Sequence, residues 1–242
     1  MIRVTIWNEF YKPNDGKPAE LSVYPNGIHG AIADFLTEND SEITVTTRTM
    51  HDKEFGFDNE TLENTDVLLY WSHIVQDAIP DEIVERVQRY ALSGMGLIVL
   101  HSGHASKLFR RLMGTNTNRL RWHEDALPCR IWKIDYAHPI AEGLDDYFEL
   151  AHEETYGEHF DIPQPDDLVF VSWFPSGEVF RSGCTWHRGL GRVFYFQPGH
   201  ETLESYYDKN VQKVICNAVR WAYRPNVGSY SYVTDETKAI VM

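Results

Sequence analysis

The feature that most constrains the fold is an alternation of strand-like segments with segments of helical periodicity in the first hundred residues. Residues 26–39 and 80–94 carry apolar side chains at helical spacing, and a strand-like segment stands on each side of both. Strands and helices in this succession form a mainly parallel sheet with helices on both faces. We therefore predict an α/β fold with a doubly wound sheet, whose first strands are residues 2–7, 43–48, 66–71 and 95–100.

The second half of the chain has a different pattern, in which strand-like segments follow one another at short intervals. Closely spaced strands favour antiparallel pairing, so we expect antiparallel additions to the sheet before a closing helix over residues 207–223. Residues 1–223 are predicted to form a single domain. The tail, 224–242, lacks a clear period and is interpreted as an oligomerisation arm. We therefore expect the protein to form a homo-oligomer. The expected antiparallel strands are residues 128–135, 147–150, 167–173, 177–183 and 191–197.

Composition argues against several classes of partner. The chain has 36 acidic residues against 22 lysines and arginines, a formal net charge of −14 at pH 7. Nucleic-acid binding calls for a basic surface, which this balance does not favour. No segment is apolar for long enough to cross a bilayer, and three scattered cysteines suggest reduced thiols. We expect a cytoplasmic protein that binds neither nucleic acid nor membrane.

Polar side chains that can do chemistry follow five of the predicted strands. The carboxyl ends of parallel strands meet at one edge of a sheet, where ligands bind, so we expect these side chains to gather there. Imidazoles and carboxylates without cysteine suit zinc or a similar divalent ion, and a catalytic ion needs about three protein ligands and an open position. The predicted metal ligands are His29, His73, Glu154 and His200.

Other residues near the same edge are predicted to act on the substrate or to bind it. His101 and His104 are either further ligands or acid–base groups, because imidazole titrates near neutrality, and Glu154 is also a candidate for proton transfer. A metal-free alternative uses the same residues as a hydrogen-bonding pocket, with Glu154 or His101 as general base. The predicted substrate-binding residues are Asn8, Glu9, Trp71, Ser102, Glu158 and Glu201.

Two further features have a structural and a functional interpretation. Tryptophans, Trp122 among them, could stack on a sugar ring, although large aromatic side chains more often fill cores. Cys184 stands close to His187, which suggests a cysteine hydrolase, but both fall in a predicted hairpin turn, so a structural role is favoured.

The segment after the fourth strand has the form of a sharp strand-to-helix turn. Such turns project a nucleophile between small residues, and Gly103 lies two positions after His101, which places His101 where the nucleophile would stand. Histidine is a poor nucleophile for acyl transfer, so the turn is interpreted as an elbow whose chemistry has changed. The alternative is that Gly103 only eases entry into the helix that follows.

Several long blocks, from about residue 2 to 223, resemble the ThuA family, the trehalose-utilisation proteins. They include VYPNGIHGAIADFL, GMGLIVLHSGHASKLFRRLMGT, HPIAEGL, NAVRWA and the stretch from HEETYGEHF to FQPGHE. The resemblance implies a flavodoxin-like fold of the class I glutamine amidotransferase type. Glutaminases of that superfamily carry a catalytic cysteine at the elbow, where this chain has His101. Glutamine hydrolysis through a thioester is therefore not expected.

The resemblance also implies a role in the use of trehalose, related disaccharides or keto-sugars. Residues shared with the family pattern include His29, His101, Glu154, Gly199 and His200. We expect an enzyme, a metal-assisted hydrolase or isomerase, that acts on a small neutral sugar. The alternative is a non-catalytic sugar-binding protein or a partner subunit of a sugar dehydrogenase.

Overall fold

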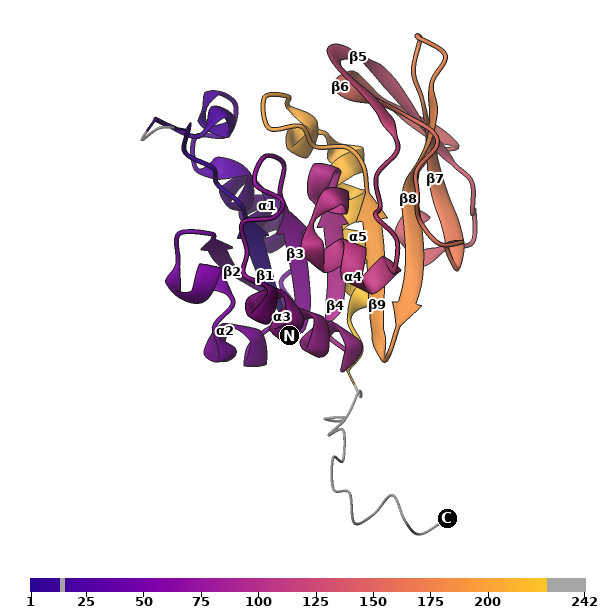
Figure 1. The fold of residues 1–242 in the computed structure, drawn as a ribbon. Coiled ribbons are helices and arrows are strands. Elements are labelled where there is room, and N and C mark those ends of the chain that lie inside the picture. Colours follow the sequence, from indigo (N-terminus) through magenta and orange to yellow (C-terminus); the bar gives the residue numbers. More distant parts are fainter. Residues whose placement is uncertain (14–15, 226–242) are drawn as a thin grey trace.

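The computed structural model describes residues 1–13 and 16–225 and contains one nine-stranded sheet in the order β2-β1-β3-β4-β9-β8-β7-β5-β6 (Figure 1). The first five strands of that order are parallel to one another. Their carboxyl ends therefore lie along one edge. These strands are β1 (Ile2–Asn8), β2 (Ile43–Thr49), β3 (Val67–Trp71), β4 (Gly96–Leu100) and β9 (Gly191–Phe196).

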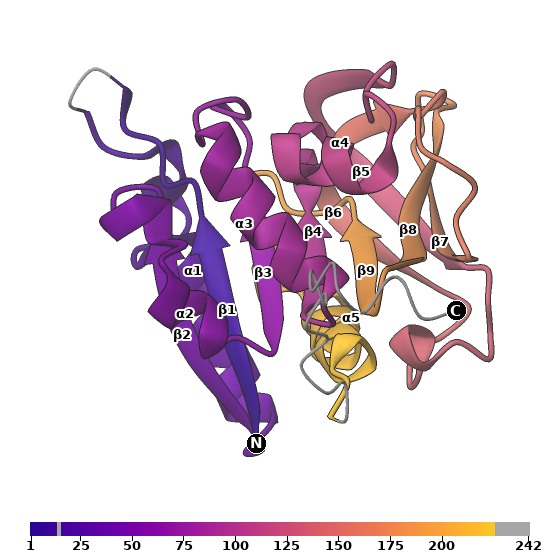
Figure 2. The ribbon, with the colours of Figure 1, turned by 60° about the horizontal axis from the view of Figure 1, so that its bottom comes forward.

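Helices cover both faces of this parallel half, as Figures 1 and 2 show. Alternate residues of each strand enter two separate apolar cores: Val4 of β1 packs on one face, and Trp7 packs on the other. Every residue of β3 and β4 is buried, as expected for strands covered on both faces. The first core includes α1 (Gly27–Asn39) and α5 (Lys209–Ala222); the second includes α2 (Asn59–Glu63), α3 (Asp81–Leu92) and α4 (Lys107–Met113).

The second half adds antiparallel strands beyond β9, which confirms the predicted fold class. In sheet order these strands are β8 (Val179–Arg188), β7 (Asp167–Trp173), β5 (Arg121–Lys133) and β6 (Tyr147–Gly157). The strand β9 itself, expected among the antiparallel strands, pairs in parallel with β4. Although β6 is the last strand of the sheet, it contacts both β8 and the short helix η6 (Ser205–Tyr207). The sheet therefore curls, and this curvature brings β6 to the carboxyl end of β9.

The sequence places most helix boundaries correctly. Asn26 precedes α1, but its side chain does not cap the helix; Glu20 does so instead, accepting a hydrogen bond from the Ile28 amide at 3.0 Å. Asp208 caps α5 as an ordinary N-cap residue, accepting hydrogen bonds from two amides of its first turn. None of the described helices is long and apolar enough to cross a membrane.

Three strands of the second half are longer than predicted. The strand β6 continues to Gly157, so Glu154 lies within it and not after it, and β5 already begins at Arg121. The added part of β5 is polar and exposed, whereas that of β6 contains the buried polar residues Glu153, Glu154 and Thr155, so in both strands the apolar pattern does not reach the end of the strand. The C-terminal arm expected from residue 224 lies, except for its first two residues, outside the described part of the chain.

The strand β8 also continues, to Arg188, so Cys184 and His187 are strand residues and not turn residues. Three positions apart on a strand, they point to opposite faces. The Cys184 thiol is buried, and burial raises its pKa to about 12, whereas the His187 ring contacts Asp166 at 2.8 Å. The two side chains do not form the dyad that a cysteine hydrolase would need.

Candidate functional site

The predicted sharp turn follows β4 directly. His101 has a φ of 52°, in the left-handed region that residues other than glycine seldom adopt. A short helix, η4 (His101–Ala105), leads from it into α4. A Cβ atom at Gly103 would lie 3.0 Å from Val99 and 3.3 Å from the Tyr70 carbonyl oxygen, so the close approach of the turn to β3 favours glycine. The elbow projects the imidazole of His101 beyond the end of the sheet.

Three imidazoles meet at this edge, one after each of three adjacent parallel strands. His73 follows β3, His101 follows β4, and His200 follows β9. The ring centroids of His73 and His200 are 5.1 Å apart, and each lies 5.5 Å from that of His101. With Zn–N bonds of about 2.0–2.1 Å in tetrahedral geometry, two imidazoles on one ion would place their centroids about 5 Å apart. The spacing of the three rings suits a metal site.

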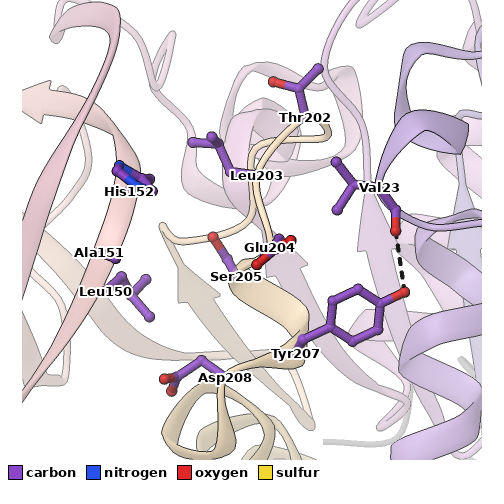
Figure 3. A pocket seen from close by; sticks show the side chains of 10 residues that line it. All are labelled: Val23, Leu150, Ala151, His152, Thr202, Leu203, Glu204, Ser205, Tyr207 and Asp208. Atoms are coloured by element: carbon purple, nitrogen blue, oxygen red, sulfur yellow. Dashed lines mark hydrogen bonds between the residues drawn. The ribbon is translucent and has the colours of Figure 1, made fainter.

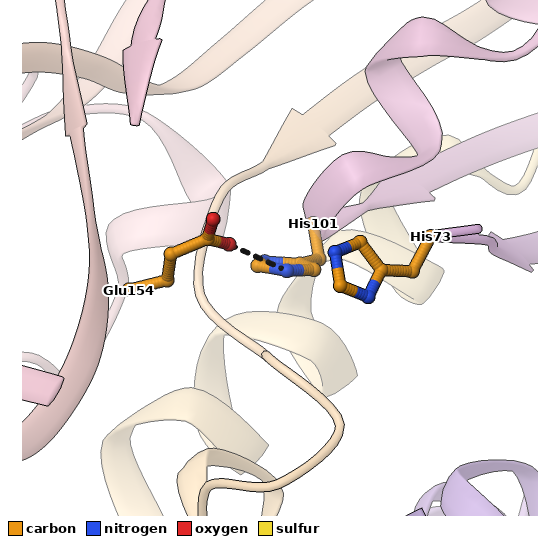
Figure 4. Close-up of side chains that lie close together, drawn as sticks. All are labelled: His73, His101 and Glu154. Carbon is orange, nitrogen blue, oxygen red and sulfur yellow. Dashed lines mark ion pairs between the residues drawn. The ribbon is translucent and has the colours of Figure 1, made fainter. Parts of the chain in front are cut away.

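Two carboxylates complete this cluster. Glu154 Oε2 lies 3.1 Å from His101 Nε2, and Figure 4 shows these two side chains meeting beside His73. Glu201 Oε2 lies 2.7 Å from His73 Nδ1. The cluster contains two sets of three possible ligand atoms, and within each set the atoms lie within 4.8 Å of one another. His73 belongs to both sets. The sets are His73, His101 and Glu154, and His73, His200 and Glu201.

The atoms that face one another in the cluster are buried and unsatisfied. They approach closely, but none has a hydrogen-bond partner of acceptable geometry among the described residues. Buried polar atoms are almost always paired, so a group of them that converges without partners fits an ion bound between them. These atoms are His73 Nδ1, His101 Nε2, Glu154 Oε2, His200 Nε2 and Glu201 Oε2.

Within the cluster, His101 and Glu154 carry opposite charges. The His101 ring contacts the Gln197 carbonyl oxygen through Nδ1 at 3.0 Å, and a carbonyl only accepts, so Nδ1 carries a proton and Nε2 faces Glu154. Burial alone would lower the pKa of His101, but contact with Glu154 outweighs it and raises the pKa to about 9. Burial likewise opposes ionisation of Glu154, yet contact with His101 keeps its pKa below the usual value. The two form a buried ion pair.

His200 and Glu201 have the protonation states that suit ligands of a cation. Burial, together with the neighbouring charge of His101, lowers the pKa of His200 to about 4, so its imidazole is neutral at pH 7. Burial would raise the pKa of Glu201, but the contact with His73 prevails and brings it to about 2. A neutral imidazole thus stands beside an ionised carboxylate.

Two further buried carboxylates hold the loops that carry the cluster. Glu9 is 1% exposed and accepts hydrogen bonds from the amides of His73, Ile74 and Val75 at 2.7–3.1 Å. The substrate-binding role of Glu9 stays a prediction; its oxygens are bonded to the backbone of the loop after β3. Fixing that loop orients the His73 ring, which is the usual task of residues behind a metal ligand.

Glu153 does the same for the loop after β9 and was not predicted. It is fully buried and accepts hydrogen bonds from the amides of Glu154 and Gly199, both at 2.9 Å, and from Ser205 Oγ at 2.6 Å. Burial raises its pKa, and these donors together with His101 oppose that rise. The carboxylate joins β6 to the segment that carries His200 and Glu201.

Glu153→Gln is expected to weaken this junction. The amide group of glutamine would face a backbone N–H or a hydroxyl in place of an acceptor, and each buried donor left unpaired costs about 1–3 kcal/mol. Equilibrium denaturation should show this loss, and binding of Zn²⁺ should weaken about 10–100-fold. Glu149→Gln, on the same strand but at an exposed ion pair with Arg130, is the matched control. Equal effects of the two substitutions would contradict the role given to Glu153.

Two predicted site residues, one at the end of β1 and one in the first turn of α1, lie apart from the cluster. His29 belongs to neither ligand set; its Nδ1 lies 3.0 Å from Asn8 Nδ2, and its ring packs edge-on against Phe10. Asn8 is fully buried and donates to Glu20 at 2.8 Å, so its side chain is not available to a substrate. The cause is Glu20, which ties Asn8 to the start of α1 and with it the first turn that carries His29.

Glu158 is also engaged elsewhere. Beyond the end of β6 it forms two contacts with the guanidinium of Arg181, at 2.8 and 2.9 Å, and these lower its pKa although burial acts in the opposite direction. Trp71 lies behind the cluster: it is 3% exposed, donates to the Gly199 carbonyl oxygen at 3.0 Å, and stacks parallel to His101. The substrate-binding role of Glu158 and Trp71 stays a prediction.

A pocket of about 210 Å³ opens beside the cluster. His73 and Glu154 border it, together with the predicted residues Ser102 and His104. The His104 ring donates through Nδ1 to the Thr117 carbonyl oxygen at 2.9 Å, and burial lowers its pKa to about 4, so it is neutral. Sequence reasoning had assigned no role to the other lining residues, apart from noting Trp122. They are Gln76, Ala105, Asn118, Leu120, Trp122, Glu124 and Tyr156.

Two other hollows differ in their relation to the cluster. A mainly apolar pocket of about 190 Å³ touches it through Glu201 and is also lined by Glu9 and Trp71. A cleft of about 550 Å³ between β6 and η6, shown in Figure 3, contains no member of the cluster. The pocket of about 210 Å³ is therefore the one of these three that is bordered by both His73 and Glu154. The larger cleft is lined by Val23, Leu150, Ala151, His152, Thr202, Leu203, Glu204, Ser205, Tyr207 and Asp208.

Comparison with known families identifies the chain. Residues 3–222 match the family described as ThuA, trehalose utilisation. The chain belongs to the ThuA family. A search of curated proteins found no match to this ThuA-family protein. The family assignment confirms the resemblance, and it connects the His/Glu cluster with a protein family of sugar utilisation.

Solved structures confirm the fold. A ThuA-like protein from Parabacteroides merdae is 15% identical with a TM-score of 0.68, over 91% of this chain and 89% of that one. A cytoplasmic protein from Salmonella typhimurium is 12% identical with a TM-score of 0.61, over 93% and 100%. PurLQS from Thermotoga maritima is 11% identical with a TM-score of 0.56, over 91% and 98%. At such identities the likeness concerns the fold, which is of the ThuA and glutamine amidotransferase type.

Proposed function

We propose that this ThuA-family protein is a metal-dependent enzyme of sugar utilisation, a hydrolase or isomerase acting on a neutral sugar or keto-sugar. The observation that carries the proposal is the convergence of five buried nitrogen and oxygen atoms, none of them in a hydrogen bond of acceptable geometry, beside a pocket. The family description supports a sugar as substrate. Zinc is the expected ion, since the ligands are imidazole and carboxylate.

The residues divide into ligands and proton carriers. His73, His200 and Glu201 would hold the ion, a set of two imidazoles and one carboxylate that leaves a position open. In this set Glu201 is a metal ligand in place of Glu154 and His29, which the sequence predicts as ligands. Bound there, a divalent ion would polarise a carbonyl or activate water. Glu154, which borders the pocket and contacts His101, would transfer the proton.

Glutamine hydrolysis is not favoured by these residues. His101 occupies the elbow, and imidazole cannot replace the thiolate that forms the thioester. Cys129 and Cys184 are buried in strands, Cys216 is in α5, and none belongs to either ligand set. The amidotransferase fold is therefore proposed to serve another reaction at the same sheet edge.

Metal analysis combined with a sugar assay tests the proposal. Protein purified without chelator is expected to contain about one divalent ion per chain by elemental analysis. Glucose release or isomerisation, followed with trehalose and with a keto derivative of trehalose as substrates, should stop after dialysis against a chelator. Activity should return when Zn²⁺ is added, because the ligand side chains remain in place.

Two results would contradict this function. Full turnover by protein that contains no metal would overturn the role of the ion. Tight binding of these sugars by metal-loaded protein without any turnover would favour the alternative of a non-catalytic sugar-binding protein or dehydrogenase subunit.

A further inference from the structure

The outer wall of the site pocket is built from one face of the β5–β6 hairpin. Trp122 pairs with Tyr156 across the two strands, and paired side chains of antiparallel strands lie on the same face. Side chains two residues apart share that face, which places Glu154 beside Tyr156. The alternation accounts for the lining residues that the two strands contribute, Trp122, Glu124, Glu154 and Tyr156, and Leu120 directly precedes β5.

Trp122 is exposed to solvent, unlike the tryptophans that fill the core. Its side chain is 58% exposed, whereas Trp7 and Trp186 are buried in the core. Tyr156 beside it is buried, with its hydroxyl 2.6 Å from Ser102 Oγ and its ring stacked on His101. The hairpin thus presents an open indole at the mouth and a fixed aromatic ring further in, next to the cluster.

The polar groups of the pocket suit hydroxyls better than charged groups. Asn118 and Glu124 are exposed at the mouth and can donate to or accept from a ligand. Gln76 is already used: it donates to the Ser102 carbonyl oxygen at 2.8 Å and accepts from Ser72 at 2.7 Å. The polar groups left to bind a ligand are therefore Asn118 and Glu124, and Glu124 lies two residues from Trp122 on β5.

The charge of the pocket excludes an anionic ligand. Glu124 and Glu154 line it, and no lysine or arginine does so among the residues that the structure describes. Apart from an ion held by His73, a phosphate would find no cationic partner among the lining residues and would lie next to Glu124 and Glu154, which is unfavourable. The net charge of −14 acts in the same direction.

We propose that this pocket binds an unphosphorylated pyranose ring, with the apolar face of the ring stacked on Trp122. The hydroxyl edge would meet Asn118 and Glu124, and the ring would lie beside Glu154 and His73. An indole supplies a large apolar surface of fixed orientation, as the C–H face of a sugar requires. The inference rests on the proposed function for the nature of the substrate, and it adds the binding surface and the exclusion of sugar phosphates.

Calorimetric titration with trehalose and with trehalose 6-phosphate tests the inference. Metal-loaded wild-type protein is expected to bind trehalose and to bind trehalose 6-phosphate at least about tenfold more weakly. Trp122→Ala should weaken trehalose binding by about tenfold or more, and Trp122→Phe, which keeps a ring, should recover part of it. Trp173→Ala is the matched control, because Trp173 is 40% exposed but lies on β7 outside the pocket.

The inference is overturned if trehalose does not bind, if Trp122→Ala binds it as tightly as the wild type, or if the phosphorylated sugar binds equally well. Circular dichroism of each variant shows whether it is folded. Elemental analysis separates the two proposals. Sugar binding that depends on Trp122 in protein without metal would leave this inference and remove the metal-dependent function, whereas a bound ion without sugar binding would do the reverse.

Discussion

His73→Ala is expected to eliminate the bound divalent ion and to reduce turnover by more than about 100-fold. His73 belongs to both sets of converging ligand atoms, so no alternative trio in the cluster survives its removal. Loss of residues that only support a ligand costs about 10–100-fold in metal affinity or activity, and loss of a ligand should cost more. Elemental analysis and the sugar assay measure the two effects.

The matched control is His187→Ala. That imidazole is also paired with a carboxylate, Asp166 at 2.8 Å, but its side chain is 53% exposed and lies on β8. It should leave metal content and turnover unchanged. Denaturation in the presence of chelator should show similar stability for the two variants. Retention of one tightly bound ion by His73→Ala would refute the assignment of the ligands.

The parallel half of the fold could be predicted because burial on both faces makes a strand visible in the sequence. In β3 and β4 the apolar run and the strand coincide, so the polar residues that follow mark the edge of the sheet. His73, His101 and His200 follow adjacent parallel strands, and the structure brings them together as expected. Strand order itself was not needed, since the ends of parallel strands lie on the same side.

The positions of Glu153 and Glu154 in β6 could not be predicted from such a pattern. Glu154 reaches the cluster from inside an antiparallel strand, because the sheet curls and brings β6 to the end of β9. Glu153 next to it has the same side-chain chemistry but supports the loop after β9 through contacts 46 residues away in the chain. One sequence cannot distinguish a buried carboxylate that binds amides from one that acts on a substrate.

His29 shows that the same sequence pattern can also belong to a residue outside the cluster. It begins a helix after the first strand, and the pattern that identified the other histidines applies to it equally. What separates it from the cluster is Glu20, a buried residue of a short helical turn before α1 that binds both Asn8 and the first turn of α1. Such contacts depend on loop conformation, which local patterns do not determine. Glu201, predicted to bind substrate, reaches His73 through a similar contact between loops.

Gly199→Ala is expected to destabilise the protein by about 2–5 kcal/mol, combining backbone strain with steric overlap. Gly199 has a φ of 128°, and an added Cβ would lie 2.1 Å from the Tyr206 hydroxyl oxygen and 2.4 Å from its Cζ. Tyr206 is fully buried, and its amide is bonded to Tyr24, so the ring cannot withdraw easily. Because His200 is the next residue, Zn²⁺ binding should weaken as well.

Gly177→Ala separates the two contributions to this loss. Gly177 has a φ of 98°, but an added Cβ would meet no described atom within 4 Å, so only the backbone strain of about 1–3 kcal/mol remains. The excess loss at Gly199, measured by denaturation of both variants, reports the overlap with Tyr206. That excess and a weakened affinity for Zn²⁺ should occur together, because the same backbone amide that binds Glu153 precedes the ligand. If Gly199→Ala costs no more than Gly177→Ala and the metal affinity is unchanged, the loop adapts, and the cluster does not depend on a rigid connection between β6 and β9.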